Sequence, residues 1–152
     1  IGGGMGLAVA CDIRLCEDKS RFAIPAAKLG LGYGYEGIRR LANLVGPAMV
    51  KEIFFTARQF SAGEAQEMGL VNRVLPPHML APYVDDYAKR ISENAPMTME
   101  SVKAIVQAIQ DDESARDLDA LDAMVKACFA SQDYIEGRRA FMEKRKPDFT
   151  GS

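Results

Sequence analysis

The spacing of apolar and polar positions divides the chain into a mixed first half and a helical second half. Up to Cys11 apolar residues dominate, and over 12–16 and 21–24 they alternate with polar ones. These patterns predict a helix followed by a hairpin of two short strands, with Asp18–Ser20 as the turn. The first half is therefore expected to combine helix and strand.

In the second half, apolar residues recur three and four positions apart, the spacing of one helix face. Three amphipathic helices are predicted over 80–91, 99–109 and 118–129, separated by Pro96 and by the acidic residues 111–113. Their apolar faces are expected to form a core, and a subunit contact is the open alternative.

Turn and capping signals lie between these two patterns. Ser61–Glu64 is a capping box that starts a short helix, Gly69 ends that helix, and a strand is expected over 70–74. Residues 29–37 hold four glycines in nine positions, which indicates a loop suited to a ligand, and 38–45 has helical spacing.

Composition excludes several classes of protein. The 152 residues fit one domain, and a net charge of −2 without a basic stripe argues against nucleic acid binding. No apolar run approaches the roughly 20 residues of a membrane span. Three cysteines without a CxxC pair and a single histidine make structural zinc and a disulfide framework improbable, so a soluble cytoplasmic protein is expected. Because the chain opens inside a glycine motif without an initiator Met, we expect a fragment of a longer protein.

The glycines Gly2, Gly3 and Gly4 run directly into an apolar stretch of helical character. Glycine lets a backbone N–H approach a ligand closely, and a helix start adds unpaired N–H groups and positive potential. Such a turn suits a developing negative charge. The alternative, that the glycines only permit tight helix packing, is equally compatible with this segment. The segment has neither the Gly-Lys-Ser/Thr of a phosphate loop nor the setting of a dinucleotide fingerprint.

Recognisable motifs follow one another from one end of the chain to the other, at 2–14, 22–25, 29–32, 40–41, 45–46, 56–58, 61–65, 69–74 and 136–147. In this order they resemble the enoyl-CoA hydratase/isomerase (crotonase) family. Within the family, Tyr33 and the segments 51–53 and 131–134 resemble methylmalonyl-CoA decarboxylase.

The resemblance implies an α/β (α+β) fold, a spiral of ββα units followed by helices that assemble trimers. Residues 1–75 would form the C-terminal part of the spiral, truncated at its N-terminus, and 76–152 the helical trimerisation region. A homotrimer or a dimer of trimers is implied. The implied substrate is an acyl-CoA thioester, with coenzyme A entering as part of the substrate and no separate cofactor or metal.

The resemblance also assigns roles to residues. Gly3 would donate one of two oxyanion-hole N–H groups, and the other would lie before Ile1. A hydratase needs two carboxyl groups, one to activate water and one to deliver a proton. The family holds them at the positions that are Gly6 and Ala26 in this chain. Since neither residue can transfer a proton, hydration by the standard pair is disfavoured.

The glycine-rich loop offers replacements for the missing acids. Tyr33 and Glu36 are the candidates for catalysis, although Tyr33 can instead fill space and Glu36 can instead favour a helix start. Decarboxylation of a malonyl-type CoA needs no general base, because loss of CO₂ itself generates the enolate. The expected substrate-binding residues are Gly2, Gly4, Gly6, Pro25, Ala26, Gly34, Tyr35, Phe141 and Lys144.

Lys144 is expected to bind CoA phosphates and Phe141 to cover the adenine, whereas a solvated C-terminal cap is the alternative. Three functions remain open. They are a decarboxylating enzyme that forms an enolate, a hydratase or isomerase with a different acid such as Glu36, and a catalytically empty oligomerising fragment.

Overall fold

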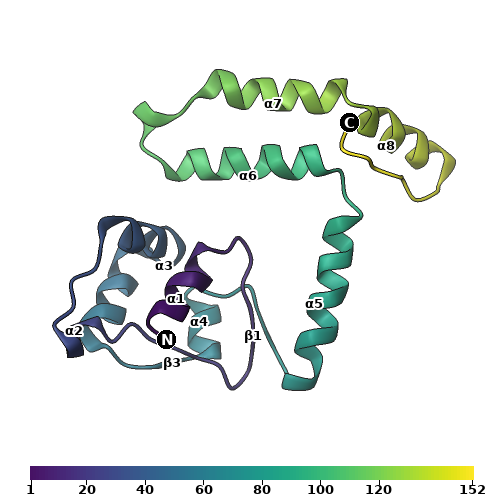
Figure 1. Ribbon diagram of the computed structural model, residues 1–152. Helices are drawn as coiled ribbons and strands as arrows, with labels where there is room; N and C mark the ends of the chain where they lie inside the picture. The colour runs from purple at the N-terminus through teal and green to yellow at the C-terminus, as the bar shows by residue number, and fades with distance from the viewer. The chain divides into compact units, whose positions relative to one another are not determined.

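The computed structural model describes residues 1–152 and divides the chain into two compact units, Ile1–Asp85 and Asp86–Ser152. Each unit is described by itself (Figure 1).

The first unit mixes helices with short strands. Its elements in chain order are α1 (Gly3–Ala10), β1 (Leu15–Glu17), β2 (Arg21–Phe22), α2 (Ala26–Leu29), α3 (Tyr35–Thr56), β3 (Phe60–Ser61), α4 (Ala62–Glu67) and β4 (Arg73–Leu75). The predicted helix after the glycines is confirmed by α1. The helix expected over 38–45 is part of α3, which continues to Thr56 across a kink where Gly46 takes φ 78° before Pro47.

The predicted hairpin is wrong, although both of its strands exist. β1 pairs in parallel with β4, with Cys16 opposite Val74, whereas β2 pairs antiparallel with β3. The turn is present, since the Ser20 N–H donates to the Glu17 carbonyl oxygen. The strands then separate into different sheets, because residues more than thirty positions away supply each partner. The alternating pattern identified exposed and buried faces but carried no information about pairing.

The capping box and the glycine stop are confirmed. The Ser61 hydroxyl accepts from the Glu64 N–H at 3.2 Å, and the Glu64 carboxylate accepts from the Ser61 N–H at 2.7 Å. Gly69 follows α4 with φ 81°. The strand expected over 70–74 starts later, at Arg73, because Leu70 and Val71 are buried and their N–H groups bind the Ala65 carbonyl oxygen.

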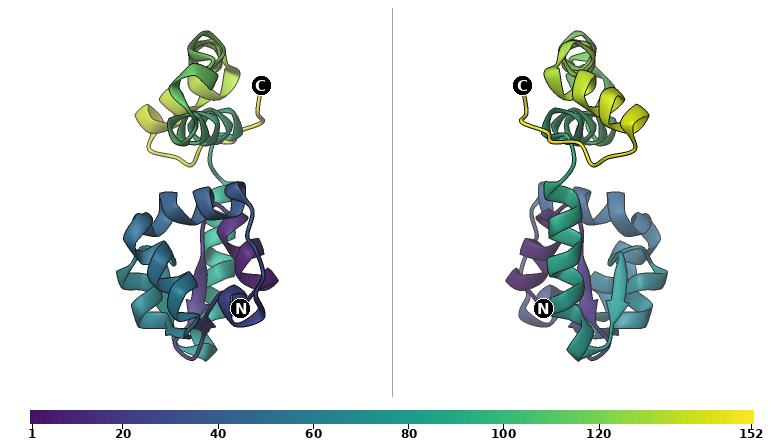
Figure 2. Two further views of the ribbon diagram at one scale, coloured as in Figure 1. Left: turned by 90° about the vertical axis from the view of Figure 1, so that its left-hand side faces the viewer. Right: turned by 90° about the vertical axis from the view of Figure 1, so that its right-hand side faces the viewer.

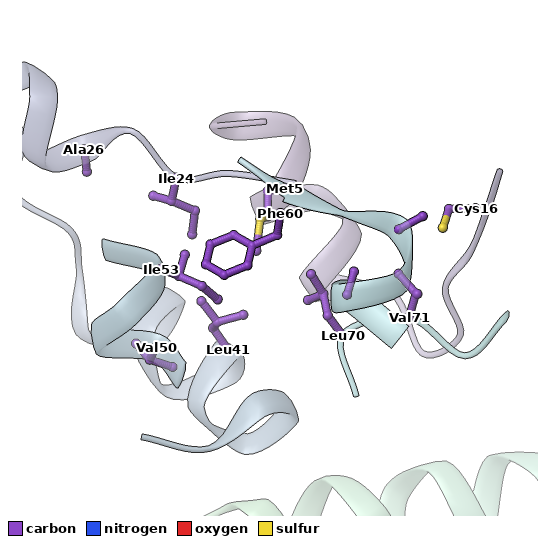
Figure 3. Close-up of a cluster of buried hydrophobic side chains, with 12 residues drawn as sticks. Met5, Cys16, Ile24, Ala26, Leu41, Val50, Ile53, Phe60, Leu70 and Val71 are labelled. Atoms are coloured by element: carbon purple, nitrogen blue, oxygen red, sulfur yellow. The ribbon is translucent and has the colours of Figure 1, made fainter. Parts of the chain in front are cut away.

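The hydrophobic core of the first unit gathers side chains from α1, α3, α4 and the strands. Phe60 lies at its centre, with Ile53 and Ile24 on one side and Met5 beside the ring (Figure 3). Leu41 and Leu70 are also almost completely buried. The start of α1 is therefore anchored in the best-packed part of the unit.

The second unit is helical, as the spacing predicted. α5 (Pro77–Ser92) leads into it, followed by α6 (Pro96–Gln110), a single 3₁₀ turn (Glu113–Ala115), α7 (Leu118–Ala130) and α8 (Gln132–Glu143). α6 packs against α7, and α7 against α8, as the two side views also show (Figure 2). None of the helices has the length and apolar character needed to cross a membrane.

Candidate active site

The start of α1 presents two free backbone donors. Gly2 precedes the helix with φ 58° and its N–H donates to the Ala23 carbonyl oxygen at 2.9 Å. The N–H groups of Gly3 and Gly4 donate to no atom of the chain. A Cβ built on either glycine meets nothing within 4 Å, so space is open beside these donors. The geometry suits an acceptor atom that approaches the helix start.

The hydrogen bond from the Gly2 N–H to the Ala23 carbonyl oxygen brings the segment 22–25 beside the glycine turn. Pro25 caps α2, and Ala26 is its first residue, buried at 4% exposure. Ala26 belongs to the same core cluster as Met5 of α1. Ala26 and Met5, the neighbour of Gly6, thus belong to one cluster, and neither position 6 nor position 26 offers an ionisable group.

Tyr33 reaches back from the glycine-rich loop to α1. A Cβ built on Gly6 would lie 3.7 Å from the Tyr33 hydroxyl oxygen, and one built on Gly37 would lie 2.9 Å from Cε1 of the same ring. Gly37 therefore makes room for the ring, which stacks edge to face on Phe54 at 5.0 Å between centroids. The hydroxyl makes no hydrogen bond within the chain. It is available to a ligand that approaches α1 beside Gly6.

The loop residues that follow Tyr33 lie at the start of α3. Gly34 caps α3, and Tyr35 begins that helix with 73% of its surface exposed. The Glu36 carboxylate accepts from the Arg39 guanidinium at 3.0 Å one turn along the helix. Glu36 thus has the position of a helix-start acid, and its charge is already paired.

Arg14 is a buried residue that the sequence did not single out. Its Nε donates to the Leu70 carbonyl oxygen at 2.6 Å, and Nη1 donates to the Cys11 carbonyl oxygen at the end of α1. Its backbone N–H donates to Asn72 Oδ1 at 2.8 Å, and the Asn72 N–H returns a bond to the Arg14 carbonyl oxygen. Burial lowers the pKa of the guanidinium, which nevertheless remains charged at physiological pH.

Comparisons with known proteins identify the family of the chain. The family described as enoyl-CoA hydratase/isomerase matches residues 1–152. The chain belongs to the enoyl-CoA hydratase/isomerase family. A crotonyl-CoA hydratase from Syntrophomonas wolfei is 40% identical over 151 residues, which cover 98% of this chain and 57% of the relative. A carnitinyl-CoA dehydratase from Salmonella arizonae is 36% identical, over 99% of this chain and 59% of the relative.

The fold is shown in the same way. The crystal structure of an enoyl-CoA hydratase/carnithine racemase from Magnetospirillum magneticum superposes with a TM-score of 0.89 at 34% identity, covering 99% of this chain and 56% of that one. The expected crotonase-type mixture of helices and sheets is confirmed. The chain spans little more than half the length of these two relatives and of this solved structure.

The remaining predicted site residues of this family member lie in the second unit. Phe141, 82% exposed, lines an apolar groove of about 580 Å³ together with Val102, Phe129 and Phe149. Lys144 caps α8 with φ 53° and does not line that groove. Their contact with CoA stays a prediction. No group of three His, Cys, Asp or Glu side chains is arranged to hold a metal ion.

Sequence reasoning missed the supporting residues of the site. Gly37 was seen only as one glycine of a loop, and its role depends on the Tyr33 ring that passes over it. Arg14 carried one local signal, a charged residue between Ile13 and Leu15 in an apolar stretch. Nothing in that stretch indicated that Leu70 would provide the acceptor.

Proposed function

We propose that this family member acts on an acyl-CoA thioester through an enolate and removes the carboxylate of a malonyl-type CoA. The observation that carries the proposal is the pairing of Gly6 with Tyr33: a Cβ built on Gly6 would lie 3.7 Å from the Tyr33 hydroxyl oxygen, and the resemblance assigns a hydratase carboxylate to position 6. The absence of an ionisable side chain at Ala26 is the second support. The proposal also draws on the resemblance of Tyr33 and of the segments 51–53 and 131–134 to methylmalonyl-CoA decarboxylase.

Decarboxylation requires a group that stabilises the negative charge of the enolate, and it requires no general base. When the bond between the α-carbon and the carboxylate breaks, CO₂ leaves and the electron pair enters the thioester as an enolate. A proton then adds to the α-carbon to give the shortened acyl-CoA. An N–H aimed at the enolate oxygen lowers the barrier, and one such donor typically contributes a rate factor of about 10² to 10³.

Gly3 would supply that donor, with its N–H free and the space beside it open. A second donor would come from residues before Ile1. Gly2 and Gly4, together with Pro25 and Gly34 at the starts of α2 and α3, would border the bound substrate. Coenzyme A is part of the substrate, and no separate cofactor is needed for these steps.

Tyr33 would bind and orient the departing carboxylate. Its hydroxyl is unpartnered, and the ring is held between Phe54 and Gly37, so the donor is positioned before the substrate arrives. Tyr35, exposed at the start of α3, would border the acyl group. Phe141 and Lys144 would contact the CoA adenine and phosphates, and a homotrimer or dimer of trimers would be the working assembly.

A hydratase or isomerase is the second candidate, because the crotonyl-CoA hydratase from Syntrophomonas wolfei is 40% identical to this chain. It requires a proton donor other than residues 6 and 26. Glu36 is the acid of the loop, but its carboxylate is already engaged by the Arg39 guanidinium at 3.0 Å. The third possibility is that these 152 residues alone form a catalytically empty oligomerising part.

The test uses the full-length protein with methylmalonyl-CoA and crotonyl-CoA. We expect decarboxylation to exceed hydration, and Tyr33→Phe to lower kcat/KM roughly tenfold to a hundredfold, the value of one hydrogen bond to a charged group. Glu36→Gln, which changes an acid already paired with arginine, is the matched control and should leave decarboxylation nearly unchanged. Rapid hydration that survives Glu36→Gln and depends on an acid before Ile1 would overturn the proposal.

If the 152-residue chain forms trimers yet binds no CoA, the third possibility holds for this fragment. Size-exclusion chromatography with light scattering and a CoA titration answer that question separately.

A further inference from the structure

Apolar packing anchors helix α1 mainly at its start. Met5 is its only fully buried side chain, at 2% exposure, whereas Leu7 is 72% exposed. A cavity of about 220 Å³ lies beneath the rest of the helix, lined by Met5, Ala8 and Cys11 together with residues of β1 and the segment after α4. Near the C-terminal end only Val9 packs against the core, and it is only partly buried, so side-chain packing holds this end of α1 less firmly than the start.

Arg14 holds that end by hydrogen bonds instead. Its two donors join the Cys11 carbonyl oxygen, directly after α1, to the Leu70 carbonyl oxygen, which belongs to a residue 1% exposed in the core. Arg14 is itself kept in place by its reciprocal backbone bonds with Asn72. The result is a connection between the core and the last turn of α1 through one planar group.

We propose that Arg14 is a positioning residue for the reaction, because its guanidinium fixes the axis of α1 and with it the direction of the Gly3 N–H. The proposal rests on the oxyanion role of Gly3 in the proposed function. Arg14 touches no substrate atom and acts through the helix. It extends the site from the glycine turn to the opposite end of α1.

The length of the helix makes this control effective. Cys11 lies six residues from the Met5 anchor, about 9 Å along the axis at 1.5 Å per residue. A displacement of about 2 Å at Cys11 would tilt α1 by roughly 13°, which is within the range of 10–20° at which catalytic geometry is lost. A small misplacement of this kind can cost about a hundredfold in rate.

The chemistry of the side chain predicts how substitutions behave. Arg14→Met keeps the apolar stem and removes both donors. Arg14→Lys keeps the positive charge, but a single ammonium does not reproduce the planar fork that reaches two carbonyl oxygens. If the two hydrogen bonds of the guanidinium are needed, both variants lose activity. If the positive charge alone is needed, Arg14→Lys keeps the activity of the wild type.

The experiment measures kinetics and hydrogen exchange in the full-length protein. For Arg14→Met and Arg14→Lys we expect kcat with methylmalonyl-CoA to fall about 10- to 100-fold with little change in KM, and the amides of α1 to exchange faster. Arg58→Met is the matched control, since the ion-pair and ring partners of Arg58 are Glu52, Glu64 and Phe60, none of which belongs to α1. It should lower Tm while leaving kcat and α1 exchange unchanged.

The outcomes separate this proposal from the proposed function. Unchanged exchange in α1, a restored kcat in Arg14→Lys, or an equal loss of kcat in Arg58→Met overturns the role of Arg14. Faster exchange in α1 with unchanged kcat overturns the oxyanion role of Gly3, and the catalytic part of this proposal with it. If Arg14→Met does not fold, Arg14→Lys carries the test.

Discussion

The two units of this protein hold themselves together in different ways. All twelve residues of the buried hydrophobic cluster lie in the first unit, between Met5 and Val71. In the second unit Ala140 is the only fully buried apolar residue, and the other buried residues there are Ser101, Ser131 and Asp133. One unit is organised around apolar packing and the other around polar anchors.

Polar contacts in the second unit hold its C-terminal tail, residues 145–152, against α8. The Asp133 carboxylate accepts from the N–H groups of Thr150 and Gly151 at 2.8 and 2.9 Å. Glu136 accepts from Arg145 and from the Asp148 N–H. Large apolar side chains meanwhile stay exposed on these helices, Phe129 at 63% and Met142 at 80%. Both units therefore expose large apolar side chains, with Leu29 at 73% and Phe55 at 78% in the first, and they differ in what they bury, which is apolar side chains in the first unit and mainly polar ones in the second.

The largest effect is expected from the centre of the first core. Phe60→Ala should lower the free energy of unfolding by about 3–5 kcal/mol, because it removes a ring that is 2% exposed and on which Arg58 stacks at 3.7 Å. Phe141→Ala, the same change at an exposed position of the second unit, should stay within about 0.5 kcal/mol. Urea unfolding of both variants measures the two free energies of unfolding. Equal losses would contradict the difference between the units.

A smaller loss is expected from the polar anchor of the second unit. Asp133→Ala leaves two tail N–H groups without their acceptor and should cost about 1–3 kcal/mol. Thermal unfolding gives the loss, and limited proteolysis should show earlier cleavage after residue 145. The control is Asp148→Ala, whose carboxylate accepts no hydrogen bond within the chain. A tail that stays equally protected in Asp133→Ala would contradict the anchor.

The smallest effects concern one partly exposed glutamate in each unit, Glu64 and Glu136. The Ser61 N–H first and Arg58 second lower the pKa of Glu64 to about 2, and Arg145 first lowers the pKa of Glu136 to about 2. Because both pKa values are lowered on folding, these carboxylates stabilise the protein above about pH 4.5 and lose that contribution as pH falls toward 2. The Tm differences between wild type and Glu64→Gln or Glu136→Gln should shrink over this range.

The salt dependence of stability distinguishes Glu64 from Glu136 further. Glu136 is held mainly by a charge and Glu64 mainly by a backbone N–H, so 1 M NaCl should weaken the contribution of Glu136 more. Melting curves at low and high salt measure it. Equal salt sensitivity would mean that Arg58 rather than the capping box dominates at Glu64.

Local signals predicted the local structure of both units. Spacing found α5, α6 and α7 but did not single out α8, and the capping box and Gly69 placed α4, because these features depend on neighbours a few residues away. The glycine motif likewise indicated the helix start that carries Gly3. The strands were found but not their pairing, since the partner of Cys16 is Val74 and no local pattern specifies it.

The sequence by itself determined the family, the glycine turn, and the absence of carboxyl groups at Gly6 and Ala26, because each depends on which residue occupies a position. Only the tertiary structure decided that the Tyr33 hydroxyl lies over Gly6, that Arg39 pairs Glu36, and that Arg14 ties α1 to Leu70. Those contacts join residues whose proximity arises from packing, and packing is a property of the folded chain rather than of any segment of it.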